Sequence, residues 1–285
     1  MYDQAERLRK QISKHGKRAK TIAVVSGKGG VGKSNTALNF SIELSSLGKQ
    51  VLLFDLDVGM GNINILLGKD STYSIVDLFK EYRPIRDMIE LGPKGLSYIA
   101  GGSSLDELLN LDNDRLDFFF EQYDRLTEKY DYILFDLGAG ASSSTLSFTL
   151  AADECFVITT PEPTAITDAY SMIKHIVLQK GAMPVSVLIN RCNRTKEGHK
   201  TLERFTEVID RFLKKEVYQL GILPNDQTVL QAVMRQTPYV LLDEKAPVSK
   251  AMKQIVRNYL KQSNEVNKLE PKSFVQKLKS LLAAR

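Results

Sequence analysis

The sequence is short of cysteine and has no long hydrophobic run. Its two cysteines, Cys155 and Cys192, lie far apart, each beside an apolar run typical of a strand, so no disulfide framework is indicated. There is no Cys-x-x-Cys pair, which argues against an iron–sulfur or thiol-transfer role. A signal-peptide pattern and a run of about 18 apolar residues are also missing. We therefore expect a cytoplasmic protein that does not span a membrane.

The charge is distributed unevenly over the 285 residues, although the net charge is only +5. Residues 1–20 carry seven basic and two acidic side chains, and residues 271–285 carry four basic side chains and no acidic one. The body between these ends is mildly acidic. Such an asymmetry indicates that the ends meet something anionic or a partner protein. The hydrophobic content of 43% is ample for one large domain or two small ones.

Apolar runs alternate with helical patterns along most of the chain. Residues 51–55, 131–136 and 184–192 include continuous apolar stretches, as expected for strands covered on both faces of a parallel sheet. The alternation predicts an α/β fold with a mostly parallel, doubly wound sheet flanked by helices on both faces.

Residues 26–35 read Ser-Gly-Lys-Gly-Gly-Val-Gly-Lys-Ser-Asn, between a strand-like run at 21–25 and a helical pattern at 36–44. This is the pattern of a phosphate-binding loop, in which backbone N–H groups and a helix N-terminus bind phosphate oxygens. We expect Lys33 to bridge the β- and γ-phosphates and Ser34 to ligate Mg²⁺. The predicted nucleotide-binding residues of the loop are Gly27, Lys28, Gly29, Gly30, Val31, Gly32, Lys33, Ser34 and Asn35.

Three carboxylates follow strand-like runs, at the edge where α/β sheets place their ligands. Asp55 and Asp57 end one strand, where one group is needed near Mg²⁺ and one to orient the attacking water. Alternatively, one of the two caps the following turn. Asp136 ends another strand and fits a carboxylate that holds Mg²⁺ through water, and the amide of Gly140 could approach the γ-phosphate.

The loop sequence from Lys28 to Ser34, KGGVGKS, resembles the deviant Walker A pattern of the MinD/ParA group of ATPases. This resemblance implies ATP as the nucleotide and a second lysine, Lys28, that crosses a dimer interface to the partner's nucleotide. The alternative is that Lys28 is a solvated loop lysine. The resemblance also implies that Asp57 positions water and that Asp55 supports the metal shell. The catalytic residues would be Asp57, Lys28 and Lys33.

Two later segments fit adenine recognition. Asn190 ends a strand, and an amide there can pair with an adenine edge, as an asparagine at this place does in the MinD group. Alternatively, Asn190 is a turn residue. The group's Gly-x-x-Pro-x-Asp pattern is matched by Gly221, Pro224 and Asp226, with a later proline at Pro238. By resemblance, this loop should lie over the adenine.

Residues 3–9, Asp-Gln-Ala-Glu-Arg-Leu-Arg, resemble the N-terminal activator element of the FlhG family, a flagellar branch of the MinD-like ATPases. In that family the element stimulates FlhF, a GTPase of the signal-recognition type, which implies partner contacts through Gln4, Leu8 and Arg9. The segment has too few apolar groups to fold alone. The alternative is a disordered basic tail.

Near the C-terminus, Phe274, Leu278, Leu281 and Leu282 share one face of a helix, with Lys272, Lys277 and Lys279 beside it. A short basic amphipathic helix suits a membrane surface and is too short to span. One copy would bind weakly, and two copies in a dimer much better. The alternative is a final helix docked on the body. MinD-type proteins carry such a C-terminal targeting helix, and we predict membrane contacts from Phe274, Leu278, Leu281, Leu282 and Lys277.

These patterns divide the chain into a basic partner-binding segment (1–20), a P-loop ATPase domain (21–260), a linker (261–270) and a membrane-targeting helix (271–285). Resemblance to the FlhG family implies a switch that dimerises with ATP and Mg²⁺, binds the anionic inner face of the cell membrane peripherally, and dissociates on slow hydrolysis. It implies FlhF and flagellar switch-complex proteins as partners, control of flagellar number and placement, and no specific nucleic acid.

Other classes remain open. A septum-positioning MinD lacks a reason for the first 20 residues, and a DNA-partitioning ParA-type ATPase would bind phosphate backbones without sequence preference. A scaffold that binds nucleotide without turnover is disfavoured by Lys33, Asp57 and Asp136. Metal-carrier ATPases of the same fold are disfavoured by the missing cysteine pair.

Overall fold

The computed structural model describes residues 18–57, 62–71, 73–80, 82–101, 113–266 and 273–283. Within them, eight strands form one sheet in the order β3-β4-β2-β5-β1-β6-β7-β8. Neighbouring strands are parallel except β3 and β4, which are antiparallel. The strands are β1 (Lys20–Val25), β2 (Val51–Leu56), β3 (Ile89–Leu91), β4 (Ser97–Ile99), β5 (Tyr132–Leu137), β6 (Glu154–Thr159), β7 (Val185–Cys192) and β8 (Tyr218–Pro224).

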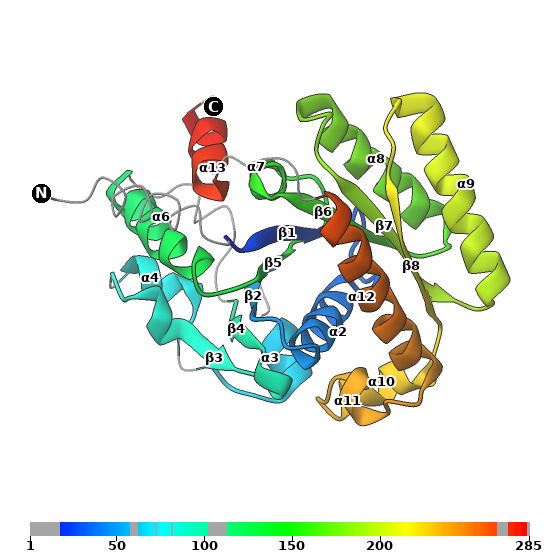
Figure 1. Cartoon of the computed structure of the whole chain (residues 1–285), viewed down its shortest axis with the longest axis horizontal. Helices are drawn as coiled ribbons and strands as arrows, with labels where there is room; N and C mark the ends of the chain where they lie inside the picture. Colours follow the sequence, from blue (N-terminus) through cyan, green and yellow to red (C-terminus); the bar gives the residue numbers. More distant parts are fainter. Residues whose placement is uncertain are drawn as a thin grey trace, which may run out of the picture.

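Helices cover both faces of the sheet, which confirms the predicted α/β fold (Figure 1). One core packs against α4 (Ile75–Lys80), α6 (Asn113–Thr127), α7 (Ser143–Ala151), α8 (Pro163–Gln179), α9 (Thr195–Leu213) and α13 (Phe274–Ala283). The other packs against α2 (Lys33–Ser46), α3 (Asn62–Leu67), α10 (Gln227–Met234), α11 (Tyr239–Leu242) and α12 (Pro247–Val266). Short 3-10 turns, η1 (Ile85–Met88) and η2 (Pro93–Gly95), flank β3.

The strand order brings the predicted site together. β1, which leads into the glycine-rich loop, lies between β5 and β6, and β5 lies between β1 and β2. Val24 and Asp55 both stand in register with Asp136. The carboxyl ends of β1, β2 and β5 therefore meet at one edge of the sheet, although the segments are up to about a hundred residues apart in the sequence.

The C-terminal helix α13 is docked on the body, which is the alternative that the sequence left open. The ring of Phe274 lies 4.8 Å from Tyr123, 4.9 Å from Phe135 and 5.8 Å from Phe148, centroid to centroid. Phe274, Val275 and Leu278 are buried. The face predicted for the membrane is thus turned inward in this structure.

The predicted linker begins too early. α12 runs to Val266, beyond the expected end at residue 260, because Lys261 and Gln262 are good helix formers and continue the helix. Residues 267–272 lie outside the described part, as do Gln4, Leu8, Arg9 and Lys272. No helix in the described ranges is both long and apolar enough to cross a bilayer.

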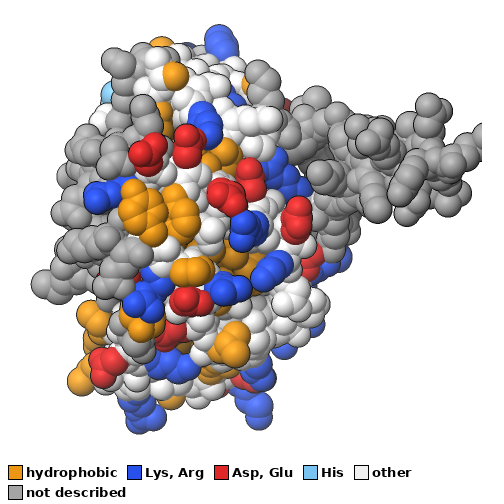
Figure 2. All heavy atoms as spheres, turned by 90° about the vertical axis from the view of Figure 1, so that its left-hand side faces the viewer, with side chains coloured by type: hydrophobic (Ala, Val, Ile, Leu, Met, Phe, Trp, Pro, Cys, Tyr) orange, Lys and Arg blue, Asp and Glu red, His pale blue; other side chains and the backbone are white. Residues whose placement is uncertain are grey.

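The left-hand side of Figure 1, where α4 and α6 lie, is seen face-on in Figure 2. Acidic and basic side chains are interspersed there around a few hydrophobic groups. The described surface on this side therefore has no field of a single sign.

Candidate active site

The glycine-rich loop joins β1 to α2 in the geometry that a phosphate site requires. Gly30 and Gly32 have φ values of 77° and 89°, in the left-handed region that favours glycine. A Cβ on Gly32 would collide with the side-chain amide of Asn190, and one on Gly27 with the backbone of Asp168. The N-cap residue of α2 is Gly32, which has no side chain that could cap the first N–H groups of the helix. This is the arrangement that binds phosphate.

Lys33 is the centre of the site. Its Nζ lies 2.6 Å from Oδ1 of Asp136, 3.2 Å from Oδ2 of Asp57 and 3.4 Å from the hydroxyl of Ser34. Burial alone would lower the pKa of Lys33, but the charges of Asp136 and then Asp57 outweigh it, and the pKa stands above its ordinary value. The ammonium group is therefore charged and already held where a triphosphate would arrive.

Asp136 has the donor atoms expected for Mg²⁺. It is fully buried, and burial raises its pKa against the opposing charge of Lys33. Its Oδ2 has no hydrogen-bond partner within the described ranges, so one buried carboxylate oxygen is available for a ligand. With the hydroxyl of Ser34 nearby, this set of hard oxygen donors fits Mg²⁺.

The two carboxylates of β2 are used differently. Asp57 is partly exposed and faces Lys33, with Nδ2 of Asn62 3.4 Å from its Oδ2. Asp55 is buried, and its oxygens accept the backbone N–H groups of Asp57 and Ile63 at 3.2 and 3.0 Å. Burial and then the charge of Asp136 raise the pKa of Asp55 to about 7. The structure thus shows Asp55 in the turn-capping role left open by the sequence, and its predicted metal role stays a prediction.

Lys28 does not face the phosphate side of its own loop. Its Nζ lies 3.2 Å from Oγ1 of Thr164 and 3.5 Å from Oε2 of Glu162, at the start of α8. The side chain is 43% exposed, which leaves it accessible to another molecule. Its predicted contact with a partner's nucleotide stays a prediction.

The loop after β5, which contains Gly140, is anchored to the phosphate loop. The N–H of Gly140 donates to the carbonyl of Ser26 over 2.9 Å, and Gly140 has a φ of 86°. α7 then begins with Ser142, whose hydroxyl accepts the N–H of Thr145. The loop that would sense the γ-phosphate is therefore continuous with α7.

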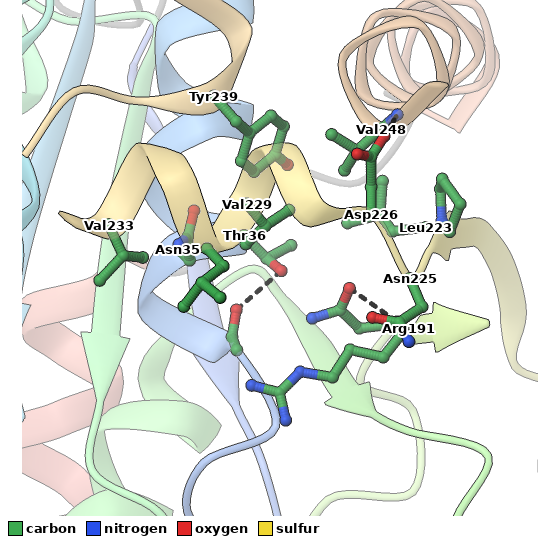
Figure 3. A pocket seen from close by; sticks show the side chains of 14 residues that line it. Asn35, Thr36, Arg191, Leu223, Asn225, Asp226, Val229, Val233, Tyr239 and Val248 are labelled. Carbon is green, nitrogen blue, oxygen red and sulfur yellow. Dashed lines mark hydrogen bonds between the residues drawn. The ribbon is translucent and has the colours of Figure 1, made fainter. Parts of the chain in front are cut away.

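A cavity of about 390 Å³ lies beside the loop (Figure 3). Its walls come from α2, the ends of β7 and β8, and α10. Both the volume of the cavity and its place beside the loop suit a base with its ribose. Its lining residues are Gly32, Asn35, Thr36, Asn190, Arg191, Leu223, Pro224, Asn225, Asp226, Val229, Leu230, Val233, Tyr239 and Val248.

Asn190 and Asp226 both line this cavity, but their polar atoms already have partners. Nδ2 of Asn190 donates to the carbonyl of Val31 at 2.8 Å, and its Oδ1 accepts the N–H of Arg191 at 2.9 Å. The carboxylate of Asp226 accepts N–H groups at the starts of two helices, α10 and α12, at 2.9 and 3.2 Å. Asp226 therefore supports the wall, and adenine recognition by Asn190 would require an exchange of partners.

The sequence reasoning missed Arg191 and Asn39. Arg191 lines the cavity with a φ of 57°, which nothing in the pattern indicated. Asn39 is fully buried, donates to Asn35 at 2.8 Å and accepts the N–H of Val240 at 3.2 Å. An asparagine on the apolar face of the helix at 36–44 was the available signal. It joins the loop helix α2 to α11.

Comparison with known proteins gives consistent results. A family model described as ParA, NUBPL iron-transfer P-loop NTPase, matches residues 17–260. The antiactivator FleN of Pseudomonas aeruginosa is 34% identical over 75% of this chain and 77% of its own length. The flagellum site-determining protein YlxH of Helicobacter pylori is also 34% identical, over 75% and 72%. The cell division ATPase MinD of Pyrococcus furiosus superposes with a TM-score of 0.70 at 25% identity, covering 86% of this chain and 99% of MinD.

Fold and loop together define a P-loop nucleoside triphosphatase. The chain belongs to the MinD/ParA family of P-loop ATPases, in its flagellar FlhG (YlxH) group. It is accordingly an enzyme that hydrolyses ATP. The iron-transfer chemistry in the description of the family model is a property of the proteins named there, and the two cysteines of this chain are both buried.

Proposed function

We propose that the protein is an ATP-dependent dimerising switch that binds the membrane reversibly and regulates the number and placement of flagella. The observation that carries the proposal is the pair of lysines in one loop. Lys33 is buried between Asp136 and Asp57, whereas Lys28 is turned away toward α8. One lysine is placed for the subunit's own nucleotide, and the other is free to act on a second subunit.

Each residue has a definite task in hydrolysis. Ser34 and Asp136 would hold Mg²⁺, which would supply positive charge against the phosphates. Lys33 exchanges its carboxylate partners for phosphate oxygens, which frees Asp57 to orient the attacking water. Lys28 of the partner subunit adds a positive charge where the leaving phosphate develops negative charge. Turnover is slow because the site is complete only in the dimer.

The switch has a physical route to the C-terminal helix. The N–H of Gly140 is bound to the phosphate loop, α7 begins two residues later at Ser142–Ser143, and α13 rests on α7 through the rings of Phe148 and Phe274. If the loop that contains Gly140 moves around the γ-phosphate, it would displace α7, on which α13 rests. Release of α13 would expose its apolar face and lysines to anionic lipid.

The flagellar part of the proposal rests on relatives. The printed names of FleN and YlxH concern antiactivation and flagellum site determination, and both align over more than two thirds of their length. We extend this to an N-terminal segment that stimulates an FlhF-type GTPase through Gln4, Leu8 and Arg9, and to flagellar switch-complex proteins as further partners.

The test is flotation with anionic liposomes in ADP or in a non-hydrolysable ATP analogue. We compare the full chain, a chain ending at Glu270, and the Lys28→Ala variant. We expect co-flotation of the full chain only with the analogue, and loss of flotation in the other two. Flotation of Lys28→Ala with the analogue, as strong as that of the full chain, would show that membrane binding does not need the dimer. No flotation in any state would overturn the membrane half, and salt-sensitive DNA binding would then favour a ParA-type role.

A further inference from the structure

Asn39 is a fully buried side chain on α2, and both ends of its amide are hydrogen-bonded. Its Nδ2 lies 2.8 Å from the carbonyl oxygen of Asn35 and 2.8 Å from Oδ1 of the same residue. Its Oδ1 accepts the N–H of Val240 at 3.2 Å, and Val240 lies in α11, 201 residues further along the chain. One side chain therefore joins the helix after the phosphate loop to α11, whose Tyr239 lines the cavity.

Two backbone groups fix the orientation of the Asn39 amide. The N–H of Val240 can only donate, and the carbonyl oxygen of Asn35 can only accept. If the amide were turned over, its NH₂ group would face the N–H of Val240, and its oxygen would face the carbonyl oxygen of Asn35. Both contacts would then be unfavourable at a buried place, where an unpaired polar group is costly. The NH₂ group of Asn39 is therefore directed at Asn35.

The same reasoning fixes the side chain of Asn35. It must offer its Oδ1 to the NH₂ group of Asn39, so its own Nδ2 is directed away from that residue. Within the described ranges no group accepts a hydrogen bond from this Nδ2. Asn35 is half-buried and lines the cavity together with Thr36 (Figure 3). The first turn of α2 thus presents two side-chain N–H donors to the cavity.

Asn35 stands between the phosphate loop and the far wall of the cavity. Lys33 begins α2 at the place of the phosphates, whereas the wall formed by α10 suits the base. The part of a nucleotide that passes Asn35 is therefore the α-phosphate with the ribose, and both offer acceptor oxygens.

We propose that Asn39 is a positioning residue for nucleotide binding, which fixes Asn35 with its NH₂ group turned toward an acceptor oxygen of the nucleotide. The effect depends on polarity: a group that cannot donate at position 39 would allow Asn35 to turn over and present its own oxygen to the nucleotide. This inference rests on nucleotide binding in the cavity beside the loop, and it needs neither the proposed dimer nor the proposed membrane contact.

The decisive variant is Asn39→Asp, which keeps the size of the side chain and an acceptor for the N–H of Val240. Once ionised, the new carboxyl cannot donate to Asn35. We expect the dissociation constant for ADP to rise about tenfold over the wild type at pH 9. The rise should be smaller at pH 6, because burial raises the pKa of a carboxyl and the protonated form still donates. Calorimetric titration with ADP measures binding without hydrolysis.

Turnover gives a second measurement on the same variant. The contact with Asn35 is made equally in the bound state and in the transition state, so kcat at saturating ATP should stay within about threefold of the wild type while KM rises. A fall in kcat with an unchanged KM would overturn the proposal.

The matched control is Gln122→Glu, which makes the same change from amide to carboxyl at a buried side chain outside the site. Oε1 of Gln122 accepts the N–H of Ile85 at 3.3 Å. This variant should lose stability in denaturant unfolding and keep its dissociation constant for ADP within about twofold of the wild type. Equal losses of ADP affinity in the two variants would overturn the proposal.

Asn35→Asp tests the same polarity without a change at the buried position. Nδ2 of Asn39 would still donate to one carboxylate oxygen, so the other oxygen would face the cavity. ADP should bind at least about tenfold more weakly than to the wild type, and more weakly than to Asn35→Ala, for which we expect about a fivefold loss. Unchanged ADP binding by Asn35→Asp would overturn the proposal even if Asn39→Asp fails to fold.

The Asn35→Ala background separates an effect through Asn35 from an effect through α11. Adding Asn39→Asp to Asn35→Ala should weaken ADP binding by less than about twofold. A further tenfold loss would overturn the proposal and show that Asn39 acts by holding α11 beside the cavity.

Nucleotide analogues identify the acceptor. A loss in Asn35→Ala that disappears with 2′-deoxy-ADP or 3′-deoxy-ADP assigns a ribose oxygen, and an equal loss with all three nucleotides assigns the α-phosphate. No loss with any of them would overturn the proposal. A wild-type protein that neither dimerises nor floats would overturn the proposed switch and leave these results unchanged.

Discussion

Two regions of the molecule differ in the residues that form them: the edge of the sheet that holds the phosphate loop, and the surface that holds α13. At the edge, charged groups are buried against one another: Lys33 is 5% exposed, and Asp55 and Asp136 are 1% and 0% exposed. Under α13 the contact is a cluster of aromatic rings around Phe274, with lysines only at the rim. The first surface depends on particular atoms, the second mainly on shape and apolar area.

This difference determines how many arrangements each region tolerates. A buried charge requires an opposite charge or a ligand at a fixed distance, so few arrangements are tolerated. An apolar helix face gains about 25 cal/mol for each Å² removed from water, and a protein groove and a lipid surface can both provide that gain. The edge of the sheet therefore tolerates few arrangements, whereas more than one kind of apolar surface could cover the face of α13.

The largest effect is expected from Lys33→Ala. The change leaves Asp136 buried without its counter-charge, and breaking one side of a buried ion pair costs about 3–5 kcal/mol. The free energy of unfolding should fall by about 3 kcal/mol and ATP turnover by at least about a hundredfold. Turnover assays and denaturant unfolding measure the two effects. Lys129→Ala, at an exposed position, is the control, and turnover within fivefold of the control would contradict the prediction.

Lys28→Ala tests whether the edge is shared between two subunits. Lys28 contacts Glu162 and Thr164 at an exposed position, so its loss should leave folding and ATP binding almost unchanged. Dimerisation with a non-hydrolysable ATP analogue should be lost, and kcat should fall about tenfold or more. Light scattering after gel filtration and turnover against protein concentration provide the measurements. A dimer that persists in the variant would show that Lys28 has no role across an interface.

A pH titration should separate the charged edge from the apolar surface. The pKa of Asp55 is raised to about 7 in the folded protein, above its unfolded value, so the folded state binds the extra proton. This carboxyl therefore lowers the stability progressively as pH rises from about 4 to 7, by about 2 kcal/mol between pH 5 and pH 7. In Asp55→Asn this dependence should disappear, so the free energy of unfolding of the variant should rise relative to that of the wild type as pH rises. If denaturant unfolding at pH 5, 6 and 7 gives the same difference between the two proteins at each pH, the prediction is wrong.

The sequence predicted which segments meet at the edge, because it marks the strand ends. The glycine-rich loop from Gly27 to Ser34, Asp57 and Asp136 all follow predicted strands, and parallel strands bring their carboxyl ends together. It did not predict that Lys33 would contact both carboxylates, nor the partners of other polar side chains near the site. The partners of Asn190 and Asp226 come from the loop and from α12, and no spacing rule indicates them.

For the C-terminal helix, the sequence predicted the element but not the surface on which it is docked. The spacing of Phe274, Leu278, Leu281 and Leu282 predicted an amphipathic helix, which α13 confirms. The pattern did not reveal its docking surface, because Tyr123, Phe135 and Phe148 lie on three elements that only the fold brings together. Periodicity identifies an apolar face and is silent about what covers it.

The smallest effect concerns the lysines that hold α13, and it compares two ion pairs of similar length. Nζ of Lys277 lies 2.7 Å from Asp153 and Nζ of Lys279 lies 2.6 Å from Asp117, but the first pair is 16–20% exposed and the second 50–67%. Asp153→Asn should therefore loosen α13 by about 1 kcal/mol, whereas Asp117→Asn should change almost nothing, because exposed pairs are screened by water. Hydrogen exchange of the α13 amides should accelerate about fivefold in Asp153→Asn and less than twofold in Asp117→Asn, with ADP bound. Because Lys277 would also meet lipid phosphate, the same variant should float more readily in ADP. Equal exchange rates in the two variants would mean that the aromatic cluster alone holds α13. Charge would then stabilise the edge of the sheet and make no measurable contribution to the docking of α13.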